Sequence, residues 1–471
     1  MSAPVPADAA VDEAVAELLG AWAPRQRWFA HKGVAAHVVR IERTPLDEAG
    51  VAQLVALTVR SGGDGEGAQG VDTVYSVPLT VRPAPDEDLA HALVGHLPDL
   101  PDGPAWVYDG PHDPTWTRAL LTLVAAEEGA GSATFGAHGT SADGGLPIPA
   151  GARTKVLGGE QSNTSIVVRA DEGEVPLIAK VFRVLSAGDN PDVVVQTALA
   201  AAGCARVPRP AGWVDGQWTA PDGSRAAGHL AHVTEFLAGS EDAWRVATAA
   251  VGAGRDFTTE ARELGRATAE VHALLAAELA TEPATPQRLG ALADGLAERV
   301  AWASAAVPQL GGAAAAAAER VEAVRHVRDA PALQRVHGDY HLGQVLHSPA
   351  RGWVLLDFEG EPLRPLAERS RPDLALRDVA GMLRSFDYAA SSVPAPDAAS
   401  AAWGAACREA FLDGYAAAGG DDPRVPGSGA AVLLAALELD KALYEVVYEA
   451  RNRPDWLRIP LGAVQRLVAA G

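Results

Sequence analysis

One segment, residues 336–361, constrains this chain more than any other, because it joins two polar loops through a short apolar run. The segment reads VHGDYHLGQVLHSPARGWVLLDFEGE. Its first loop carries Asp339 five residues before Gln344, and its second loop begins with Asp357, directly after the apolar run 353–356. A short apolar run between polar turns is typical of a buried strand. At the least, the pattern predicts two polar turns beside one buried strand, each with an acidic side chain.

The same spacing matches the phosphotransfer signature of kinases. In that signature an Asp of the catalytic loop, here Asp339, receives the proton of the acceptor hydroxyl. The amide five residues later, here Gln344, and the Asp of a D-F-x triplet, here Asp357, bind Mg²⁺. Kinases usually carry Asn in place of this Gln, and the triplet here ends in Glu359 where kinases have Gly. Kinase chemistry and two structural turns are the alternatives, and the combined spacing favours the kinase.

The bulk composition narrows the class of partner. A length of 471 residues predicts two or three domains, and 48% apolar residues indicate a globular protein with ample core. The formal net charge of −21 argues against nucleic acid or an anionic membrane as the main partner. It does not exclude ATP, because a local Lys and Mg²⁺ can bind phosphates inside an acidic protein.

Cysteine usage and the N-terminus predict a cytoplasmic protein. The two cysteines, Cys204 and Cys407, lie far apart in sequence, so a disulfide framework is not indicated and a reducing compartment fits. The first residues are acidic and lack the basic region of a secretory signal. No apolar run reaches the length that spans a bilayer, so no membrane segment is expected.

A first domain is expected over residues 1–130. Its pattern predicts a helix over 11–23, strands within 35–82, where apolar and polar residues alternate, and a helix over 115–127. Residues 130–145 are rich in Gly and Ser, which is typical of a linker. We therefore expect the chain to leave the first domain there.

A second domain, the N-lobe of a kinase, is expected over residues 146–236. The small polar residues 158–165 predict a turn between two strands, whose backbone N–H groups can approach phosphates. The next strand, 175–183, carries Lys180 among apolar residues and resembles the V-A-I-K strand of kinases. A Lys on a core strand needs an anionic partner, and ATP phosphates would supply one. The alternative is a Lys that faces solvent from a half-buried strand.

Two features of this second domain concern nucleotide binding. The helix predicted over 191–202 should carry the Glu that pairs with Lys180, but its only polar residues are Asp192 and Gln196, so the ion pair is in doubt. The strand over 229–237 ends at the expected hinge, where adenine would bind the backbone, from Glu235 to Leu237.

The remaining residues, 237–471, predict a mainly helical C-lobe. We expect His272 to be a satisfied core histidine and Asp378 to cap a helix or brace the catalytic loop. The helix over 430–451 has a core face and a second face rich in charged and aromatic residues. That second face predicts either a sugar pocket or a solvated surface.

Several motifs together resemble the actinobacterial maltokinases and, equally, the related glucosamine kinases. The resemblance covers nearly the whole chain, and it rests on HGDYHLGQVL, LLDFEGEP, RDVAGMLRSFDYAA, EQSNTS, VFR…NPD and ELDKALYEVVYEARNRP, together with RQRWFA near the N-terminus. It implies an α+β, bilobal, eukaryotic-like kinase fold of the aminoglycoside-phosphotransferase type, with an N-terminal cap domain and a mainly helical C-lobe.

The resemblance also implies ATP- and Mg²⁺-dependent phosphorylation of a sugar. Carried over, Asp339 is the catalytic base, Gln344 and Asp357 are metal ligands, and Lys180 binds the ATP phosphates. The expected loop over the phosphates comprises Gln161, Ser162, Asn163, Thr164 and Ser165. The candidate sugar contacts are Tyr340, His341, Asp440, Arg453 and Trp456.

The acceptor sugar stays open between two members of the family. The helix with Asp192 lacks a further acidic residue, and the segment between Trp244 and Phe257 is short. These departures from the maltokinase pattern favour glucosamine, which would give glucosamine 6-phosphate. Its ammonium needs carboxylates, and Glu359, Glu361 and Asp440 are available. The alternatives are a maltokinase that makes maltose 1-phosphate, an aminoglycoside-modifying enzyme, and a pseudokinase that senses sugar without turnover.

Overall fold

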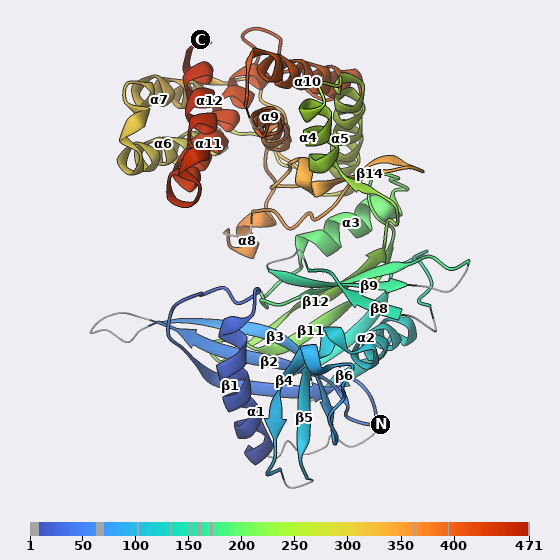
Figure 1. Ribbon diagram of the computed structural model, residues 1–471. Coiled ribbons are helices and arrows are strands. Elements are labelled where there is room, and N and C mark those ends of the chain that lie inside the picture. Colours follow the sequence, from blue (N-terminus) through green and yellow to red (C-terminus); the bar gives the residue numbers. More distant parts are fainter. Residues whose placement is uncertain are drawn as a thin grey trace. The chain divides into compact units, whose positions relative to one another are not determined.

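The computed structural model describes residues 9–62, 70–100, 103–131, 134–149, 153–158, 162–169, 173–361, 364–393 and 395–469. The chain divides into two compact units, one up to Thr197 together with Pro208–Ala238, and the other formed by Ala198–Val207 and the chain from Gly239 on. Sheets dominate the first unit and helices the second (Figure 1). The predicted α+β class with a mainly helical C-terminal part is therefore confirmed.

The first sheet of the first unit has five antiparallel strands in the order β1-β2-β3-β5-β4 (Figure 1). Exposure alternates along the start of β1, as in an edge strand, whereas the interior strand β2 is buried over most of its length. The Phe29 and Tyr75 rings stack in the core beside this sheet, with centroids 5.0 Å apart. The elements are α1 (Ala9–Trp22), β1 (Ala36–Pro45), β2 (Ala52–Ser61), β3 (Val71–Arg82), β4 (Leu93–Leu97) and β5 (Ala105–Asp109).

The second sheet has seven antiparallel strands in the order β6-β7-β11-β12-β10-β9-β8. Strand β10 lies between β12 and β9, so Lys180 is carried by an interior strand. The elements of this part are α2 (Pro114–Ala126), β6 (Gly129–Gly131), β7 (Gly136–Ser141), β8 (Arg153–Val156), β9 (Asn163–Arg169), β10 (Leu177–Phe182), β11 (Pro210–Thr219) and β12 (Arg225–Glu235). Helix α3 (Pro191–Ala201) begins in the first unit and ends in the second.

Residues 130–145 are not the linker that their composition predicts. Strand β7 lies in this range and pairs with β11 inside the second sheet. A Cβ atom at Gly139 would lie 2.1 Å from the carbonyl oxygen of Leu123, so this position must be Gly for α2 to pack on β7. The small residues of this range therefore allow close packing. The proposed division into domains at 1–130, 146–236 and 237–471 stays a prediction.

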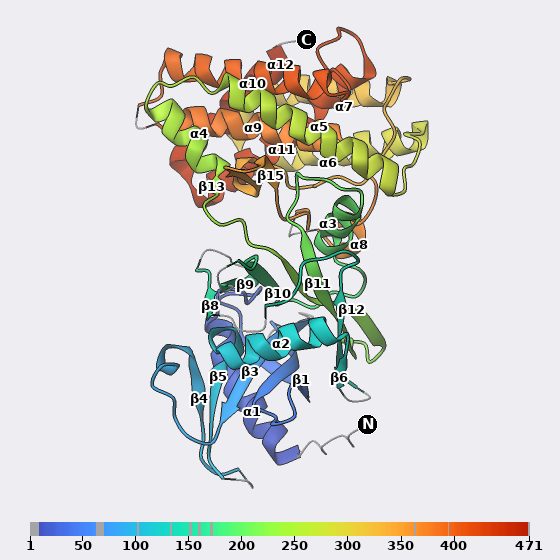
Figure 2. The ribbon, with the colours of Figure 1, turned by 90° about the vertical axis from the view of Figure 1, so that its right-hand side faces the viewer.

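The second unit consists mainly of helices beside a three-stranded sheet in the order β13-β14-β15. Helix α5 packs on α10, and α9 packs against both α10 and α11 (Figure 2). The strands are β13 (Glu241–Asp242), β14 (Val345–Ser348) and β15 (Gly352–Leu355). The helices are α4 (Ala243–Gly252), α5 (Thr258–Glu278), α6 (Pro286–Ala306), α7 (Ala313–Ala323), α8 (Leu366–Arg369), α9 (Leu376–Ser391), α10 (Ala398–Ala417), α11 (Gly429–Asn452) and α12 (Arg458–Ala469).

The hairpin β14–β15 brings the two polar loops of the sequence motif together. Val345 at the start of β14 pairs with Leu355 at the end of β15. The loop before β14 carries Asp339 and the loop after β15 carries Asp357, so both loops leave the same end of the hairpin. The predicted strand between two polar loops is confirmed. Within the described ranges, no helix has the length and apolar character that crossing a lipid bilayer requires.

Candidate active site

Asp378, in the first turn of α9, holds the backbone of the loop that carries Asp339. Its carboxylate oxygens accept hydrogen bonds from the backbone N–H groups of His337 (2.7 Å) and Gly338 (2.9 Å), and Nε2 of His272 lies 3.0 Å from Oδ2. Burial raises the pKa of this carboxyl, but the hydrogen bond and charge of His272 outweigh burial and lower the pKa overall. The bracing role of Asp378 and the core position of His272 are both confirmed.

Tyr340 does not meet the expectation that it contacts a sugar. Its side chain is 2% exposed, and its hydroxyl lies 2.9 Å from Oγ1 of Thr268 in α5. The backbone of Tyr340 approaches α9 so closely that a Cβ atom at Gly381 would lie 2.4 Å from its carbonyl oxygen. The residue therefore fixes the catalytic loop on α5 and α9, and its side chain faces the interior.

Asp339 lies on this loop beside a cation from α11. Nζ of Lys441 donates a hydrogen bond to Oδ1 of Asp339 at 3.2 Å. Burial by itself raises the pKa of Asp339, but the charge of Lys441, followed by that of His341, lowers the pKa below its ordinary value. An ionised carboxylate of this kind can accept the proton of a hydroxyl group, as a general base must.

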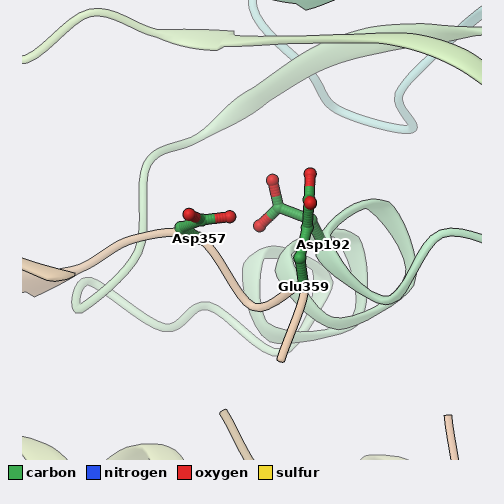
Figure 3. A group of neighbouring side chains, drawn as sticks. All are labelled: Asp192, Asp357 and Glu359. Carbon is green, nitrogen blue, oxygen red and sulfur yellow. The ribbon is translucent and has the colours of Figure 1, made fainter. Parts of the chain in front are cut away.

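Gln344, Asp357 and Glu359 form a set of oxygen-bearing side chains at the end of the hairpin. Nε2 of Gln344 lies 3.4 Å from Oδ2 of Asp357. Carboxylate oxygens of Asp357 and Glu359 lie within 4.8 Å of one another, and Figure 3 shows both side chains on the loop after β15. Asp357 has a φ of 61°, which is uncommon for a residue other than Gly and recurs at functional sites. Carboxylate and amide oxygens suit Mg²⁺, so these residues fit that ion.

A cavity of about 490 Å³ opens beside Asp339 within the second unit. Helix α11 supplies residues at helical spacing, so that its charged and aromatic face lines the cavity. Of the two alternatives for this face, a sugar pocket and a solvated surface, this position is the one expected of a pocket. The opposite face of α11 is buried in the core. The lining residues are Trp244, Asp339, His341, Gly343, Gly381, Ser385, Tyr388, Lys441, Tyr444, Glu445, Tyr448, Glu449, Arg453 and Trp456.

Three of the predicted sugar contacts line this cavity. Arg453 donates to both oxygens of Glu449 (2.9 and 2.6 Å), and its guanidinium lies 5.1 Å from the ring centroid of Trp456. The Trp456 ring in turn stacks on Tyr388. Nδ1 of His341 accepts a hydrogen bond from the N–H of Gly343, and burial lowers the pKa of His341.

Asp440 differs from the expectation that it binds the acceptor's ammonium. Oδ1 lies 3.1 Å from Nε of Arg299, and Oδ2 lies 3.4 Å from Nη1 of Arg377. Both oxygens thus already take part in ion pairs. Asp440 lines a smaller pocket next to Asp339, where these pairs hold α11 to α6 and α9. Its carboxylate acts here as a link between helices.

Lys180 has the acidic partner that the sequence left in doubt. Its Nζ lies 3.2 Å from Oδ2 of Asp192, whose side chain is 2% exposed. Nε2 of Gln196 donates to the other oxygen of Asp192 at 2.5 Å. The shorter Asp side chain, in the first turn of α3, therefore forms the ion pair expected of a Glu (Figure 3 shows Asp192 on this helix).

The expected phosphate loop is shorter than the range 161–165. Gln161 lies outside the described residues, and only Ser162 belongs to the turn before β9. Asn163, Thr164 and Ser165 begin strand β9, and the side chains of the last two are buried. Nε of Arg183 donates a buried hydrogen bond to Oγ1 of Thr164 at 2.8 Å, so this hydroxyl bonds within the protein interior. We therefore correct the loop expectation for the side chains of Thr164 and Ser165.

The predicted hinge residues lie where the chain passes from one unit to the other. Glu235 ends β12, and its carboxylate lies 3.3 Å from Nε of Arg209. Leu237 follows it, and the first unit ends at Ala238. Any contact of these residues with adenine would involve their backbone groups, so the Glu235 side chain is available for the ion pair.

The sequence places Lys441 and Glu445 on the charged and aromatic face of α11 but assigns neither of them a role of its own. Two nitrogens of Arg384 donate to Oε2 of Glu445, and burial raises the pKa of this carboxyl. Lys441, Tyr444, Glu445 and Tyr448 occupy positions i, i+3, i+4 and i+7 of α11. This spacing predicts one helix face, but it does not predict that the face lies beside Asp339.

Comparisons with known proteins show which family the chain belongs to. The model of the maltokinase N-terminal cap domain matches residues 22–113, and that of the phosphotransferase enzyme family matches residues 153–427. A glucosamine kinase of Streptacidiphilus jiangxiensis is 33% identical over 323 residues, which cover 64% of this chain and 70% of that protein. A glucosamine kinase of Mycolicibacterium smegmatis is 29% identical over 331 residues, covering 66% and 79%.

A solved structure supports the fold as a whole. It is described as a glucosamine kinase in complex with glucosamine, ADP and inorganic phosphate, and it aligns with a TM-score of 0.64 at 25% identity over 96% of this chain and 98% of that one. The predicted aminoglycoside-phosphotransferase-like fold with an N-terminal cap is thereby confirmed. The chain belongs to the phosphotransferase enzyme family and, within it, to the family of these glucosamine kinases.

Proposed function

We propose that this protein is a glucosamine kinase that transfers the γ-phosphate of ATP to a hydroxyl of glucosamine and yields glucosamine 6-phosphate and ADP. The observation that carries the proposal is the position of Asp339, whose carboxylate lies at a cavity lined by aromatic rings and further carboxylates. The names of the two relatives and of the solved structure support the acceptor. Because the reaction consumes ATP, we assign it to the cytoplasm.

Positioning and charge neutralisation supply most of the catalysis in phosphoryl transfer. Asp339 orients the acceptor hydroxyl and takes its proton. Gln344 and Asp357 would hold Mg²⁺, with Glu359 beside them, and the ion would supply positive charge against the phosphates of the nucleotide. These roles are assigned from the donor set and from the position of both loops on one hairpin.

The nucleotide is assigned to residues of the first unit. Lys180, held by Asp192, neutralises phosphate charge. Backbone N–H groups of the turn at Ser162 and the start of β9 approach the phosphates, and the backbone from Glu235 to Leu237 binds adenine. The side chains of Thr164 and Ser165 take no part, because both are buried.

The acceptor is assigned to the cavity on α11. Aromatic rings such as Trp456 pack on the apolar faces of a sugar, while Arg453 and His341 offer polar contacts to its hydroxyls. Both bonds from Arg384 to Glu445 end on Oε2, so Oε1 takes part in neither of them. We assign the ammonium of glucosamine to that oxygen, because a charged amine there favours the ionised form of Glu445.

A coupled assay of ADP release tests the proposal. Glucosamine, glucose, maltose and an aminoglycoside are offered separately with ATP and Mg²⁺, and the phosphate in each product is located by ³¹P–¹H NMR. We expect the highest kcat/KM with glucosamine and phosphate on its primary hydroxyl. A higher kcat/KM with another acceptor would contradict the assignment of the sugar.

Maltokinase activity is the second candidate. It is favoured by the match of residues 22–113 to the maltokinase cap model. Maltose 1-phosphate as the main product of the same panel would establish it. Nucleotide binding without turnover of any of the acceptors would instead indicate a sugar-sensing pseudokinase.

A further inference from the structure

Lys441 joins the two loops that the hairpin β14–β15 carries. Its Nζ lies 3.2 Å from Oδ1 of Asp339, on the loop before β14. The same ammonium lies 3.7 Å from Oε1 of Glu361, on the loop after β15. Lys441 itself belongs to α11, which packs on α9, the helix that braces the catalytic loop through Asp378. One ammonium from a third element therefore connects the loop of the base with the loop of the metal ligands.

We propose that Lys441 is a positioning residue for phosphoryl transfer, which fixes Oδ1 of Asp339 and leaves Oδ2 to receive the proton of the acceptor hydroxyl. The inference rests on the proposed kinase function. A general base needs one carboxylate oxygen directed at the substrate, and an ammonium bound to the other oxygen restricts rotation of the carboxylate. By contacting Glu361 as well, Lys441 also fixes the distance between the two loops.

The charges around Lys441 explain why a cation is required at this point. Burial lowers its pKa, but the charges of Asp339, Glu361 and Glu445 outweigh burial and raise it, so the amine stays protonated. Without Lys441, these carboxylates would repel one another across the pocket. The other titratable or charged groups around the pair are His337, His341, Asp357, Arg299, Arg377, Tyr388, Asp440, Tyr444, Tyr448, Glu449 and Arg453.

Lys441 is not a residue of the hydrophobic core, because 26% of its side chain is exposed at the pocket. A role in stability alone would therefore predict a small change in unfolding and no change in catalysis on removal of the charge. A positioning role predicts a change in kcat and in its pH dependence. These two readouts separate the explanations.

The test compares Lys441→Met and Lys441→Arg with the full-length wild-type enzyme, using glucosamine and Mg-ATP. Met keeps the length of the side chain and removes its charge, whereas Arg keeps the charge. We expect Lys441→Met to lose about 100-fold in kcat, within the range of general-base catalysis, with little change in the KM for ATP. Lys441→Arg should recover most of this loss. Arg451→Met removes a cation from an exposed position of the same helix and should leave kcat unchanged.

The pH profile supplies the second readout. Since Lys441 lowers the pKa of Asp339, its removal should raise that pKa, and the acid limb of kcat/KM should move toward neutral pH in Lys441→Met but not in Arg451→Met. Thermal unfolding of each variant over the same pH range verifies that the folded fraction is constant. An unmoved acid limb, or a loss in kcat that Lys441→Arg does not recover, would overturn the inference. A wild-type enzyme inactive toward every sugar would instead refute the proposed function.

Discussion

Lys180 and Asp192 form an ion pair in the first unit, with 3.2 Å between Nζ and Oδ2. Asp192 and Gln196 are buried, and Lys180 is partly exposed. Gln196 donates to Oδ1 of Asp192, and the backbone N–H of Asp192 donates to Oδ1 of Asn190. The bonds from Lys180 and Gln196 orient the carboxylate, and the bond to Asn190 fixes the backbone at the start of α3. The lysine assigned to the ATP phosphates is therefore held in place by α3.

Replacing Asp192 by Asn should weaken nucleotide binding. The amide keeps the shape of the side chain but removes the charge that orients Lys180. We expect the KM for ATP to rise about tenfold, the effect of losing one charged hydrogen bond, while the KM for glucosamine changes little. Asp189→Asn, at an exposed position just before α3, is the matched control and should behave as wild type. Equal KM values for ATP in both variants would contradict this role of Asp192.

Arg183 is expected to make a large contribution to stability. Its side chain is fully buried, and it lies 3.1 Å from Oδ1 of Asp109, 2.8 Å from Oγ1 of Thr164 and 5.0 Å from the ring centroid of Trp28. Arg183→Met would leave the Asp109 carboxylate without this partner. We expect the free energy of unfolding to fall by about 3 kcal/mol, as for other buried pairs that lose one member.

The control for Arg183 is Arg60→Met. Arg60 pairs with Asp72 at the surface, where solvent screens the interaction, so its removal should change the midpoint of urea unfolding little. Urea titrations followed by circular dichroism compare the two variants. A loss in Arg183→Met no larger than that in Arg60→Met would show that the buried pair is not a major source of stability.

His232 should make stability depend on pH. His232 in β12 lies opposite Lys180 in the antiparallel pairing of β12 with β10. Burial lowers the pKa of His232 from 6.5 to about 4. Between these two values the unfolded chain binds a proton that the folded chain does not, so stability falls as the pH decreases through this window. His232→Gln removes this dependence. Compared with wild type, the variant should lose about 2 kcal/mol less between pH 7 and pH 4.5.

A control variant makes this measurement specific to His232. His96→Gln replaces an exposed histidine and should keep the wild-type pH dependence. Wild type, His232→Gln and His96→Gln are unfolded with urea at a series of pH values between 7 and 4.5. Parallel curves for all three proteins would exclude His232 as the source of the pH dependence.

The sequence predicted the chemistry of the catalytic segment because that information is local. A strand with a polar loop on each side can fold in few ways, and the hairpin β14–β15 follows directly from the residues at 336–361. For Asp378 the sequence left two roles open, a helix cap and a brace of the catalytic loop, and the hydrogen bonds from the N–H groups of His337 and Gly338 show the second. Predicting the hairpin did not require knowing which distant elements meet, whereas choosing between the two roles of Asp378 did.

The features that the sequence did not predict depend on contacts between distant elements. Lys441 follows Asp339 by about a hundred residues, and nothing local indicates that α11 packs at the catalytic loop. Tyr340 adjoins Asp339 in sequence, but its side chain turns inward to Thr268 of helix α5, which lies 72 residues earlier in the chain. The glycines of β7 predicted a linker because composition alone does not distinguish a flexible segment from one that needs space for a neighbouring helix.

The assignment of Asp339 as the base is tested most directly by single-turnover phosphorylation of glucosamine by wild type and Asp339→Asn, with ADP affinity measured in parallel. The substitution removes the proton acceptor and keeps the side-chain volume. We expect the rate of phosphate transfer to fall about 1000-fold while the affinity for ADP is retained. Transfer at the wild-type rate by a folded, ADP-binding Asp339→Asn would contradict it.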